Sequence, residues 1–326
     1  MLVLVTGAAG KVGTHFLADA AARSGPESLH VRALCHSRPV APSERVSVVR
    51  GSIASREVVA EAMRDVTHVV HLATCKETPD DVIDVTVKGL FWLLEEARQS
   101  PTFRRFVLVG GDAAVGHFFV DHGGPVTEAT PHRAYPGCYA LSKVLEEVML
   151  EQYFHQYDLD GCCLRAPWIM EKDDFKYSLS FGDDVFGGPV WRDLVPADEA
   201  ARYAERGTVP CLHDAAGRPL KRNFVHVSDL VAAIFSALQS PHARQQLFNI
   251  CMTRPVDYQE VADYLMATRG LDSVRIDSGC HGNWMDNAKA RFLLGWEPAY
   301  DLHRLIDEAW AYVRPTDDPR RIWYPG

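Results

Sequence analysis

A tyrosine followed four residues later by a lysine is the pattern in this chain with the clearest chemistry. Tyr139 and Lys143 lie in a stretch with helical character, so their side chains share one face of a helix. A tyrosine hydroxyl has a reference pKa of about 10, which is too high for a base at neutral pH. A lysine cation and an oxidised nicotinamide ring beside it would both favour the phenolate. The pair therefore predicts a general acid/base for a carbinol or carbonyl oxygen, although Y-x-x-x-K alone also occurs by chance in many helices.

The element that would position a nicotinamide cofactor is a glycine loop near the N-terminus. The apolar residues 2–5 predict a buried parallel strand, and Gly7, Gly10 and Gly13 follow it before a helical pattern over 11–23. In a dinucleotide site such glycines permit a tight turn, close approach of the backbone to pyrophosphate, and close packing of helix on strand. A glycine-rich turn without function is the alternative, but strand, loop and helix occur in the expected order. The expected contacts from this loop are Gly7, Ala9, Gly10, Lys11, Val12 and Gly13.

The end of the second predicted strand, His30–Cys35, bears on the choice of cofactor. An NAD enzyme would place an acidic residue there to bind the ribose hydroxyls, whereas this chain has Cys35. His36 and Arg38 follow, and both could meet a 2′-phosphate. The sequence therefore favours NADP over NAD, with a solvated surface turn as the alternative.

Buried strands and amphipathic helices alternate through the first half of the chain. Strands are predicted over 46–49, 68–73 and 105–109, and helices over 57–64 and 80–100. This alternation predicts an α/β fold with a doubly wound parallel sheet. Ligands collect at the carboxyl ends of such strands. We therefore expect further cofactor contacts at Ser52, Ile53, Leu72 and Ala73, and Thr74 at the same edge.

Together these motifs resemble an extended short-chain dehydrogenase/reductase of the NAD-dependent epimerase/dehydratase family. T-G-A-A-G-K-V-G and Y-A-L-S-K are its two central motifs, and HLAT, LRAP, KRNFVHVSDL, LFNI and KARFLLGWEP match later landmarks over nearly the whole length. The resemblance implies a Rossmann domain over 1–166 and a smaller C-terminal α/β substrate lobe over 167–326, with the region 223–250 returning to the Rossmann sheet.

The same resemblance implies roles for individual residues. Tyr139 would be the acid/base, and Lys143 would hold the nicotinamide ribose. Pro167, Trp168 and Ile169 would lie against the nicotinamide carboxamide. Such enzymes often bind nucleotide sugars, and Arg222 and Arg275 fall near positions that hold the substrate phosphate. A surface ion pair is the alternative for each arginine.

The chain also departs from the family pattern at the reacting centre. The family usually carries Ser or Thr where this chain has Gly111, so the hydroxyl that should bond the reacting oxygen is missing. Asp112 stands where dehydratases carry an acidic residue, and a carboxyl there could donate only when protonated. The Thr74 hydroxyl can donate without a change of protonation, so Thr74 is the first candidate to replace the missing hydroxyl. Alternatively, Gly110 and Gly111 simply admit a bulkier substrate.

These observations predict an NAD(P)-dependent oxidoreductase that acts on a carbinol or carbonyl of a sugar or sugar-like substrate. An epimerase or dehydratase with transient oxidation is the first alternative. A non-catalytic NADP-binding sensor is the second, but sensor-like relatives usually lose the Tyr/Lys pair.

Composition restricts the partners. The 326 residues carry a net charge of −9, which argues against nucleic acid or an anionic membrane as the main partner. The eight cysteines form no C-x-x-C pair, so reduced thiols in the cytoplasm are expected, and no His/Cys spacing predicts a metal site. The predicted first strand begins at residue 2 and leaves no room for a signal peptide. A homodimer is possible.

Overall fold

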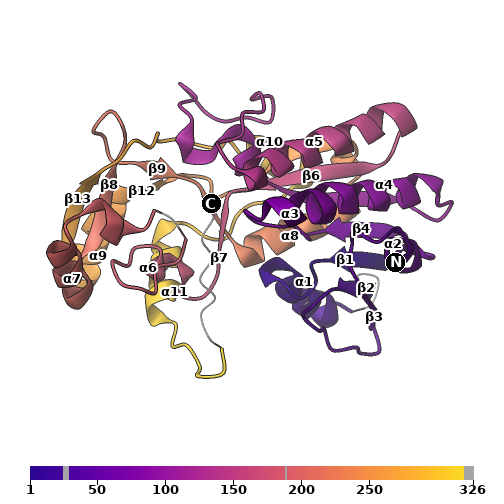
Figure 1. Ribbon diagram of the computed structural model, residues 1–326, viewed down its shortest axis with the longest axis horizontal. Helices are drawn as coiled ribbons and strands as arrows, with labels where there is room; N and C mark the ends of the chain where they lie inside the picture. The colour runs from indigo at the N-terminus through magenta and orange to yellow at the C-terminus, as the bar shows by residue number, and fades with distance from the viewer. Residues whose placement is uncertain (25–28, 188, 319–326) are drawn as a thin grey trace.

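A parallel sheet of seven strands organises the computed structural model, which describes residues 1–24, 29–187 and 189–318 (Figure 1). The strands are β1 (Leu2–Thr6), β2 (His30–Cys35), β3 (Val46–Arg50), β4 (His68–His71), β5 (Arg105–Gly111), β6 (Gly161–Ala166) and β11 (Gln246–Asn249). Their order is β11-β6-β5-β4-β1-β2-β3, and every neighbouring pair is parallel. The predicted doubly wound α/β fold is therefore confirmed. The order reverses between β1 and β4, and such a switch point is where open α/β sheets bind ligands.

Helices cover both faces of the sheet, which explains why its central strands are mostly apolar. One face packs against α1 (Lys11–Ala22), α8 (Val227–Gln239) and α10 (Ala288–Leu294). The other face packs against α2 (Arg56–Met63), α4 (Gly89–Gln99) and α5 (Cys138–Tyr157). Figure 1 shows α4 and α5 on one side of the strands and α1 and α8 on the other.

The helix predicted over 80–100 is interrupted, which corrects that prediction. It consists of α3 (Pro79–Val82), a π-helical turn over Ile83–Lys88, and α4. Within the π-helical turn, Thr86 is fully buried and its hydroxyl accepts the backbone N–H of Cys75 at 2.9 Å. Hydrophobic periodicity does not distinguish a π-helical turn from an α-helical one, and such turns often occur near functional sites.

The second half of the chain builds a smaller body of short strands and helices beside the sheet (Figure 1). Its strands are β7 (Trp168–Met170), β8 (Val209–His213), β9 (Lys221–Arg222), β10 (Phe224–His226), β12 (Val256–Asp257) and β13 (Ser273–Asp277). Its helices are α6 (Asp174–Tyr177), α7 (Ala197–Arg206), α9 (Tyr258–Arg269) and α11 (Leu302–Ala311). A separate apolar core, which includes Trp191, Phe224 and Tyr258, holds these elements together.

The region 223–250 divides between the two bodies. α8 packs on α1, and β11 forms the edge of the main sheet beside β6, but β10 pairs with β7 instead. The division of the chain at residues 166 and 167 stays a prediction. Within the described segments, no helix is long and apolar enough to span a membrane.

Candidate functional site

A cavity of about 1350 Å³ lies at the carboxyl ends of the strands. Its walls come from the glycine loop, the ends of β2, β4 and β5, the start of α5, and the chain after β6. All of the cofactor and acid/base candidates line it: Gly7, Ala9, Gly10, Lys11, Val12, Gly13, His36, Arg38, Ser52, Ile53, Leu72, Ala73, Thr74, Asp112, Tyr139, Lys143, Pro167, Trp168 and Ile169. The structure thus brings together residues spread over half of the chain, from Gly7 to Ile169, and their individual roles stay predictions.

The glycine loop has the shape that a dinucleotide phosphate requires. Gly7 adopts a positive φ of 66°, and a Cβ added there would come within 2.9 Å of the backbone nitrogen of Ala73. A Cβ at Gly13 would be 2.5 Å from the carbonyl oxygen of Gly7. Side chains at these positions would therefore disrupt the turn and the close packing of α1 on β1. The first turn of α1 contains no acidic residue, so its N-terminus is electrostatically suited to an anion.

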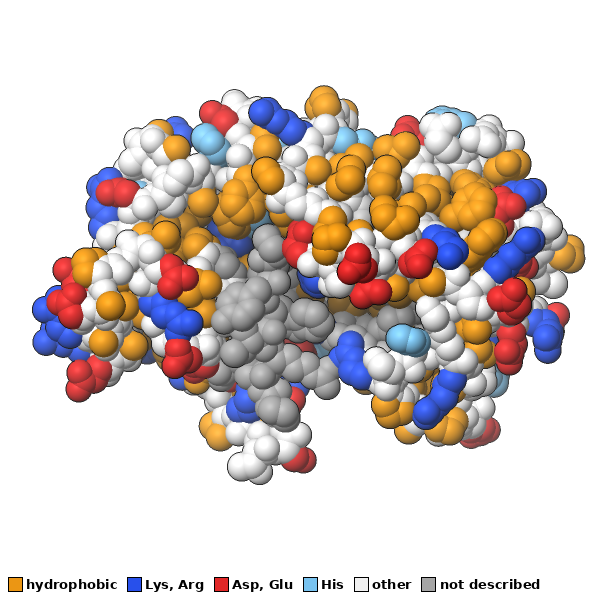
Figure 2. Space-filling model, in the orientation of Figure 1, with side chains coloured by type: hydrophobic (Ala, Val, Ile, Leu, Met, Phe, Trp, Pro, Cys, Tyr) orange, Lys and Arg blue, Asp and Glu red, His pale blue; other side chains and the backbone are white. Residues whose placement is uncertain are grey.

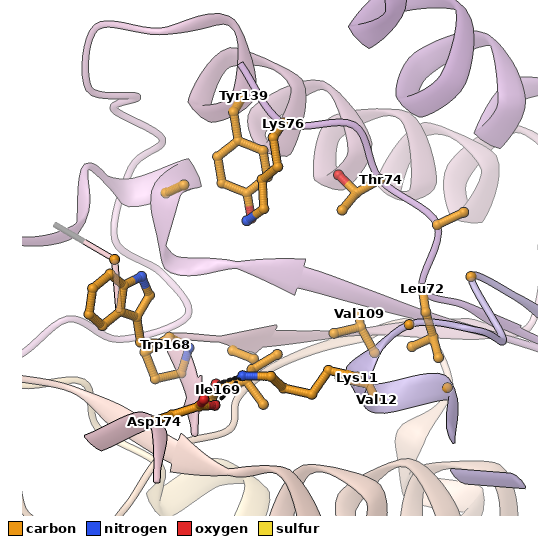
Figure 3. Close-up of a pocket in the computed structure, with 18 of the residues that line it drawn as sticks. Lys11, Val12, Leu72, Thr74, Lys76, Val109, Tyr139, Trp168, Ile169 and Asp174 are labelled. Carbon is orange, nitrogen blue, oxygen red and sulfur yellow. Dashed lines mark hydrogen bonds and ion pairs between the residues drawn. The ribbon is translucent and has the colours of Figure 1, made fainter. Parts of the chain in front are cut away.

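Lys11 extends from the glycine loop across the cavity to the second body (Figure 3). Its ammonium donates to the carbonyl oxygen of Ile169 at 2.9 Å and to Asp174 Oδ2 at 2.5 Å. Burial raises the pKa of the Asp174 carboxyl, although the Lys11 charge acts in the opposite direction. On the same side, His15 Nε2 lies 2.8 Å from Glu171 Oε2. These pairs could not be predicted from local patterns, since the partners are more than 150 residues apart.

The loop after β4 is fixed at three points. The Thr6 hydroxyl accepts the backbone N–H groups of Leu72 and Ala73 at 3.1 and 3.2 Å. The Thr86 hydroxyl accepts the backbone N–H of Cys75. Glu77 then accepts the backbone N–H groups of Cys138 and Tyr139 at 2.9 and 3.3 Å, and so caps the N-terminus of α5. This loop therefore sets the position of the helix that carries Tyr139.

Tyr139 and Lys143 meet at the cavity wall as their spacing predicts. The Tyr139 side chain points into the cavity, and Lys143 Nζ lies 5.5 Å from the centre of its ring (Figure 3). Lys143 is buried and donates to Glu146 Oε2 at 2.8 Å. Burial alone would lower the pKa of Lys143, but the charges of Glu146 and Tyr139 outweigh it and raise that pKa. The sequence analysis missed Glu146. Its spacing of three residues from Lys143 indicates that the two are neighbours on a helix, but it does not indicate that they are buried together.

Gly111 lies beside the Tyr139 hydroxyl, at the place where a serine would act. A Cβ added to Gly111 would be 3.7 Å from Tyr139 Oη and 3.6 Å from Lys143 Cδ, both ordinary contact distances. Gly110 faces the opposite way, because its Cβ would come within 2.8 Å of Cys163 Sγ. The backbone of Gly110 nevertheless lines the cavity, so the alternative that these glycines admit a bulkier substrate stays a prediction.

The two candidates to replace the missing hydroxyl have different surroundings. Thr74 lines the cavity, and its hydroxyl makes a long contact of 3.3 Å with the carbonyl oxygen of Cys75. Asp112 is buried and bonded to His117 Nδ1, while His117 Nε2 lies 3.1 Å from an Arg222 nitrogen. Burial lowers the pKa of His117, so the imidazole is neutral and can donate to Asp112 while it accepts from Arg222.

Neither of the two arginines proposed for substrate phosphate is among the residues that line the cavity, and their roles stay predictions. Arg222 is buried, and its guanidinium lies 4.2 Å from the centre of a Trp168 ring and 4.3 Å from that of Phe118. Its place on β9 turns it into the core behind these rings. Arg275 lies on the exposed side of β13, 2.7 Å from Asp277. Arg275 thus forms the surface ion pair that was its alternative.

Lys76 is the residue at the reacting end that the sequence analysis missed. It lines the cavity, and its ammonium lies 4.2 Å from the centre of the Tyr139 ring. Its position in the loop after β4 was only a weak indication that it would lie in the site. Among the described residues, no group of three or more His, Cys, Asp or Glu is arranged to hold a metal ion.

Comparisons with known proteins agree with this geometry. Residues 3–170 match the NAD dependent epimerase/dehydratase family, and the chain belongs to that family. It is 27% identical to the UDP-glucose 4-epimerase of Mycolicibacterium smegmatis over 96% of this chain and 99% of that protein. It is 22% identical to the UDP-glucose 4-epimerase of Lactobacillus helveticus over 96% and 97%.

A solved structure with bound NAD is also similar. It is a short-chain dehydrogenase/reductase superfamily protein from Agrobacterium tumefaciens, with a TM-score of 0.78, 25% identity, and coverage of 95% of this chain and 96% of that one. The predicted resemblance is therefore confirmed. The chain is an enzyme of the extended short-chain dehydrogenase/reductase type that depends on a nicotinamide cofactor.

Proposed function

We propose that this enzyme oxidises or reduces a carbinol or carbonyl carbon of a sugar-like substrate, with Tyr139 as the acid/base. The observation that carries the proposal is the convergence of Tyr139 and Lys143 on the cavity that begins at the glycine loop. A bound nicotinamide ring supplies or accepts the hydride. Tyr139 takes the hydroxyl proton during oxidation and returns it during reduction. Lys143 stabilises the phenolate, and its own charge is partly balanced by Glu146.

Transient oxidation within an epimerase or dehydratase cycle is the second candidate, because UDP-glucose 4-epimerases are among the relatives. The bond between Asp112 and His117 occupies the carboxylate that stands at the dehydratase position, which favours the first candidate over a dehydratase. The two differ in what happens to the cofactor. We expect reduced cofactor to accumulate in proportion to product when the protein is supplied with oxidised cofactor and a panel of sugars and nucleotide sugars. An altered sugar without net reduced cofactor would support the second candidate.

We also propose a preference for NADP over NAD. His36 and Arg38 line the cavity at the end of β2, and no acidic residue replaces Cys35. A 2′-phosphate gains charge-assisted hydrogen bonds there that a ribose hydroxyl cannot make. Fluorescence titration with both reduced cofactors tests this preference. The Arg38→Ala variant should weaken NADPH binding more than NADH binding, and equal or tighter NADH binding to the unaltered protein would contradict the proposal.

The possible homodimer and the cytoplasmic location stay predictions. Figure 2 shows hydrophobic side chains gathered over the helices α4 and α5. Exposed large hydrophobic side chains from these helices and the preceding π-helical turn are Ile83, Phe91, Leu141, Val148 and Tyr157. Sedimentation equilibrium would measure whether two copies associate.

A further inference from the structure

Lys76 differs from the other lysines of the cavity in its partners. Each of the others has a carboxylate: Lys11 pairs with Asp174 at 2.5 Å, Lys143 with Glu146 at 2.8 Å, and Lys172 with Asp318 at 2.7 Å. Across the described ranges 1–24, 29–187 and 189–318, the Lys76 ammonium has no hydrogen bond or ion pair, and its contact is with the face of the Tyr139 ring. Its positive charge is thus uncompensated beside the reacting centre.

The position of Lys76 separates it from the expected place of the cofactor phosphates. Figure 3 shows Lys76 alongside Tyr139 on one wall of the cavity, with Lys11 and Val12 of the glycine loop on the opposite wall. The helix N-terminus and glycine turn that suit pyrophosphate belong to that opposite wall. Lys76 therefore lies where a substrate group next to the reacting carbon would be.

The chemistry of an ammonium group determines which substrate group fits. When a bound substrate excludes water, an unpaired buried charge is costly, so a neutral substrate would leave Lys76 poorly satisfied. A carboxylate would balance the charge and form a charge-assisted hydrogen bond. Gly111 has no side chain beside the Tyr139 hydroxyl, and a Cβ there would lie 3.7 Å from that oxygen. The protein carries a net charge of −9, so an anionic substrate needs a local cation of this kind.

We propose that Lys76 forms an anion subsite that binds the carboxylate of a sugar acid, or of a similar polyhydroxy acid, next to the reacting carbinol. This inference rests on the proposed oxidoreductase function and specifies its substrate class. Lys76 binds and orients the substrate, and the proton transfer remains with Tyr139.

The test is calorimetric binding to the complex of the protein with reduced cofactor. The probes are D-glucuronate and D-galacturonate, each compared with the neutral sugar of the same ring, D-glucose or D-galactose. We expect both acids to bind more tightly than their neutral partners. Lys76→Gln should weaken binding of the acids about 10- to 100-fold, as expected when a hydrogen bond to a charged group is lost. Lys76→Arg should retain much of the affinity.

Three controls make the result specific. Lys88→Gln removes a lysine that is exposed and paired with Asp84 outside the cavity, so it should leave binding of the acids unchanged. Binding of the neutral sugars and of the cofactor should be unaffected by Lys76→Gln. Thermal unfolding should show that each variant is folded.

Each contrary result overturns the subsite. If Lys76→Gln weakens cofactor binding and not acid binding, Lys76 serves the cofactor phosphates. If no acid binds to the unaltered protein more tightly than its neutral partner, there is no carboxylate subsite. Failure of the underlying function is distinguishable in a separate turnover assay, because the acids would then bind in a Lys76-dependent manner but would not reduce oxidised cofactor. Conversely, oxidation of the acids by Lys76→Gln with an unaltered KM would uphold the function and reject the subsite.

Discussion

Replacing Glu146 with glutamine should move the acidic limb of the pH–rate profile to lower pH. Glu146 is completely buried, and its Oε2 accepts a hydrogen bond from Lys143 at 2.8 Å. Burial raises the pKa of Glu146, while the Lys143 charge opposes that rise. Glutamine preserves the size of the side chain and the acceptor oxygen but removes the negative charge. Lys143 then acts on Tyr139 as an unbalanced cation, which makes the phenolate easier to form.

The magnitude follows from the distances. Glu146 Oε2 lies 2.8 Å from Lys143 Nζ, which is 5.5 Å from the centre of the Tyr139 ring, so the carboxylate oxygen is within about 8 Å of that ring. With an effective dielectric constant of about 20, a unit charge at about 8 Å contributes ~2 kcal/mol. Since one pH unit corresponds to about 1.4 kcal/mol, the acidic limb should shift by ~1.5 units. Other titratable groups around the pair are common to both proteins: His71, Lys76, Glu77, Asp112, Tyr135, Glu147 and Cys163.

The assay is kcat/KM measured against pH at saturating cofactor. Glu151→Gln is the matched control, because it makes the same charge change at an exposed position of α5. A shift to higher pH, or a profile that coincides with that of the control, would refute the reasoning. Cofactor affinity and the melting temperature should be measured in parallel, so that loss of structure is not mistaken for a change in profile.

Three further predictions concern the acid/base, the missing hydroxyl and acid stability. Tyr139→Phe should lower turnover ~10²–10⁴-fold with little change in cofactor affinity, and unaltered turnover would reject the assigned role. Thr74→Val should lower turnover ~10²–10³-fold, the usual effect of losing one donor to the reacting oxygen, and adding Gly111→Ser should recover part of it; a fully active Thr74→Val would exclude this donor. Burial lowers the pKa of His71 to about 3, and the Lys143 charge acts in the same direction. The stability that neutral His71 provides is therefore complete above its unfolded pKa of about 6.5 and lost as pH falls toward its folded value, by up to ~1.4 kcal/mol per pH unit. Denaturant unfolding between these pH values measures this slope, and a flat dependence would contradict it.

Local sequence patterns were sufficient to predict the central sheet. The run of residues 2–5, the glycines after it and the helix from Lys11 to Ala22 are neighbours in sequence, so composition and periodicity determine them together. The pairing of β7 with β10 was beyond such reasoning. Strands of three residues have too few positions to show a period, and this pairing joins segments more than 50 residues apart.

The candidate site likewise has parts that local sequence patterns predict and parts that only tertiary contacts determine. The glycine loop and the pair of Tyr139 and Lys143 are local patterns, and both line the cavity. The surroundings of Arg222 could not be predicted, because a two-residue strand does not reveal which side faces the cavity. The role proposed for Lys76 depends on its surroundings. Its ammonium contacts the Tyr139 ring and has no carboxylate partner among the described residues. The sequence identifies this side chain as a lysine. Whether a carboxylate balances its charge depends on tertiary contacts, which the sequence does not show.

The contact of Lys11 with Asp174 and Ile169 bears on how long a nucleotide stays bound. Opening the cleft between the sheet and the second body must break this ion pair and this hydrogen bond, and also the contact of His15 with Glu171. The Asp174 side chain is 6% exposed, so water replaces the lost contacts less readily than it would at an exposed pair. We therefore expect Lys11, a residue of the predicted nucleotide-binding loop, to slow exchange of the nucleotide. Net oxidation requires that exchange in every cycle and can be limited by it, whereas a cycle that regenerates its own nucleotide proceeds at full speed behind the same closed cleft.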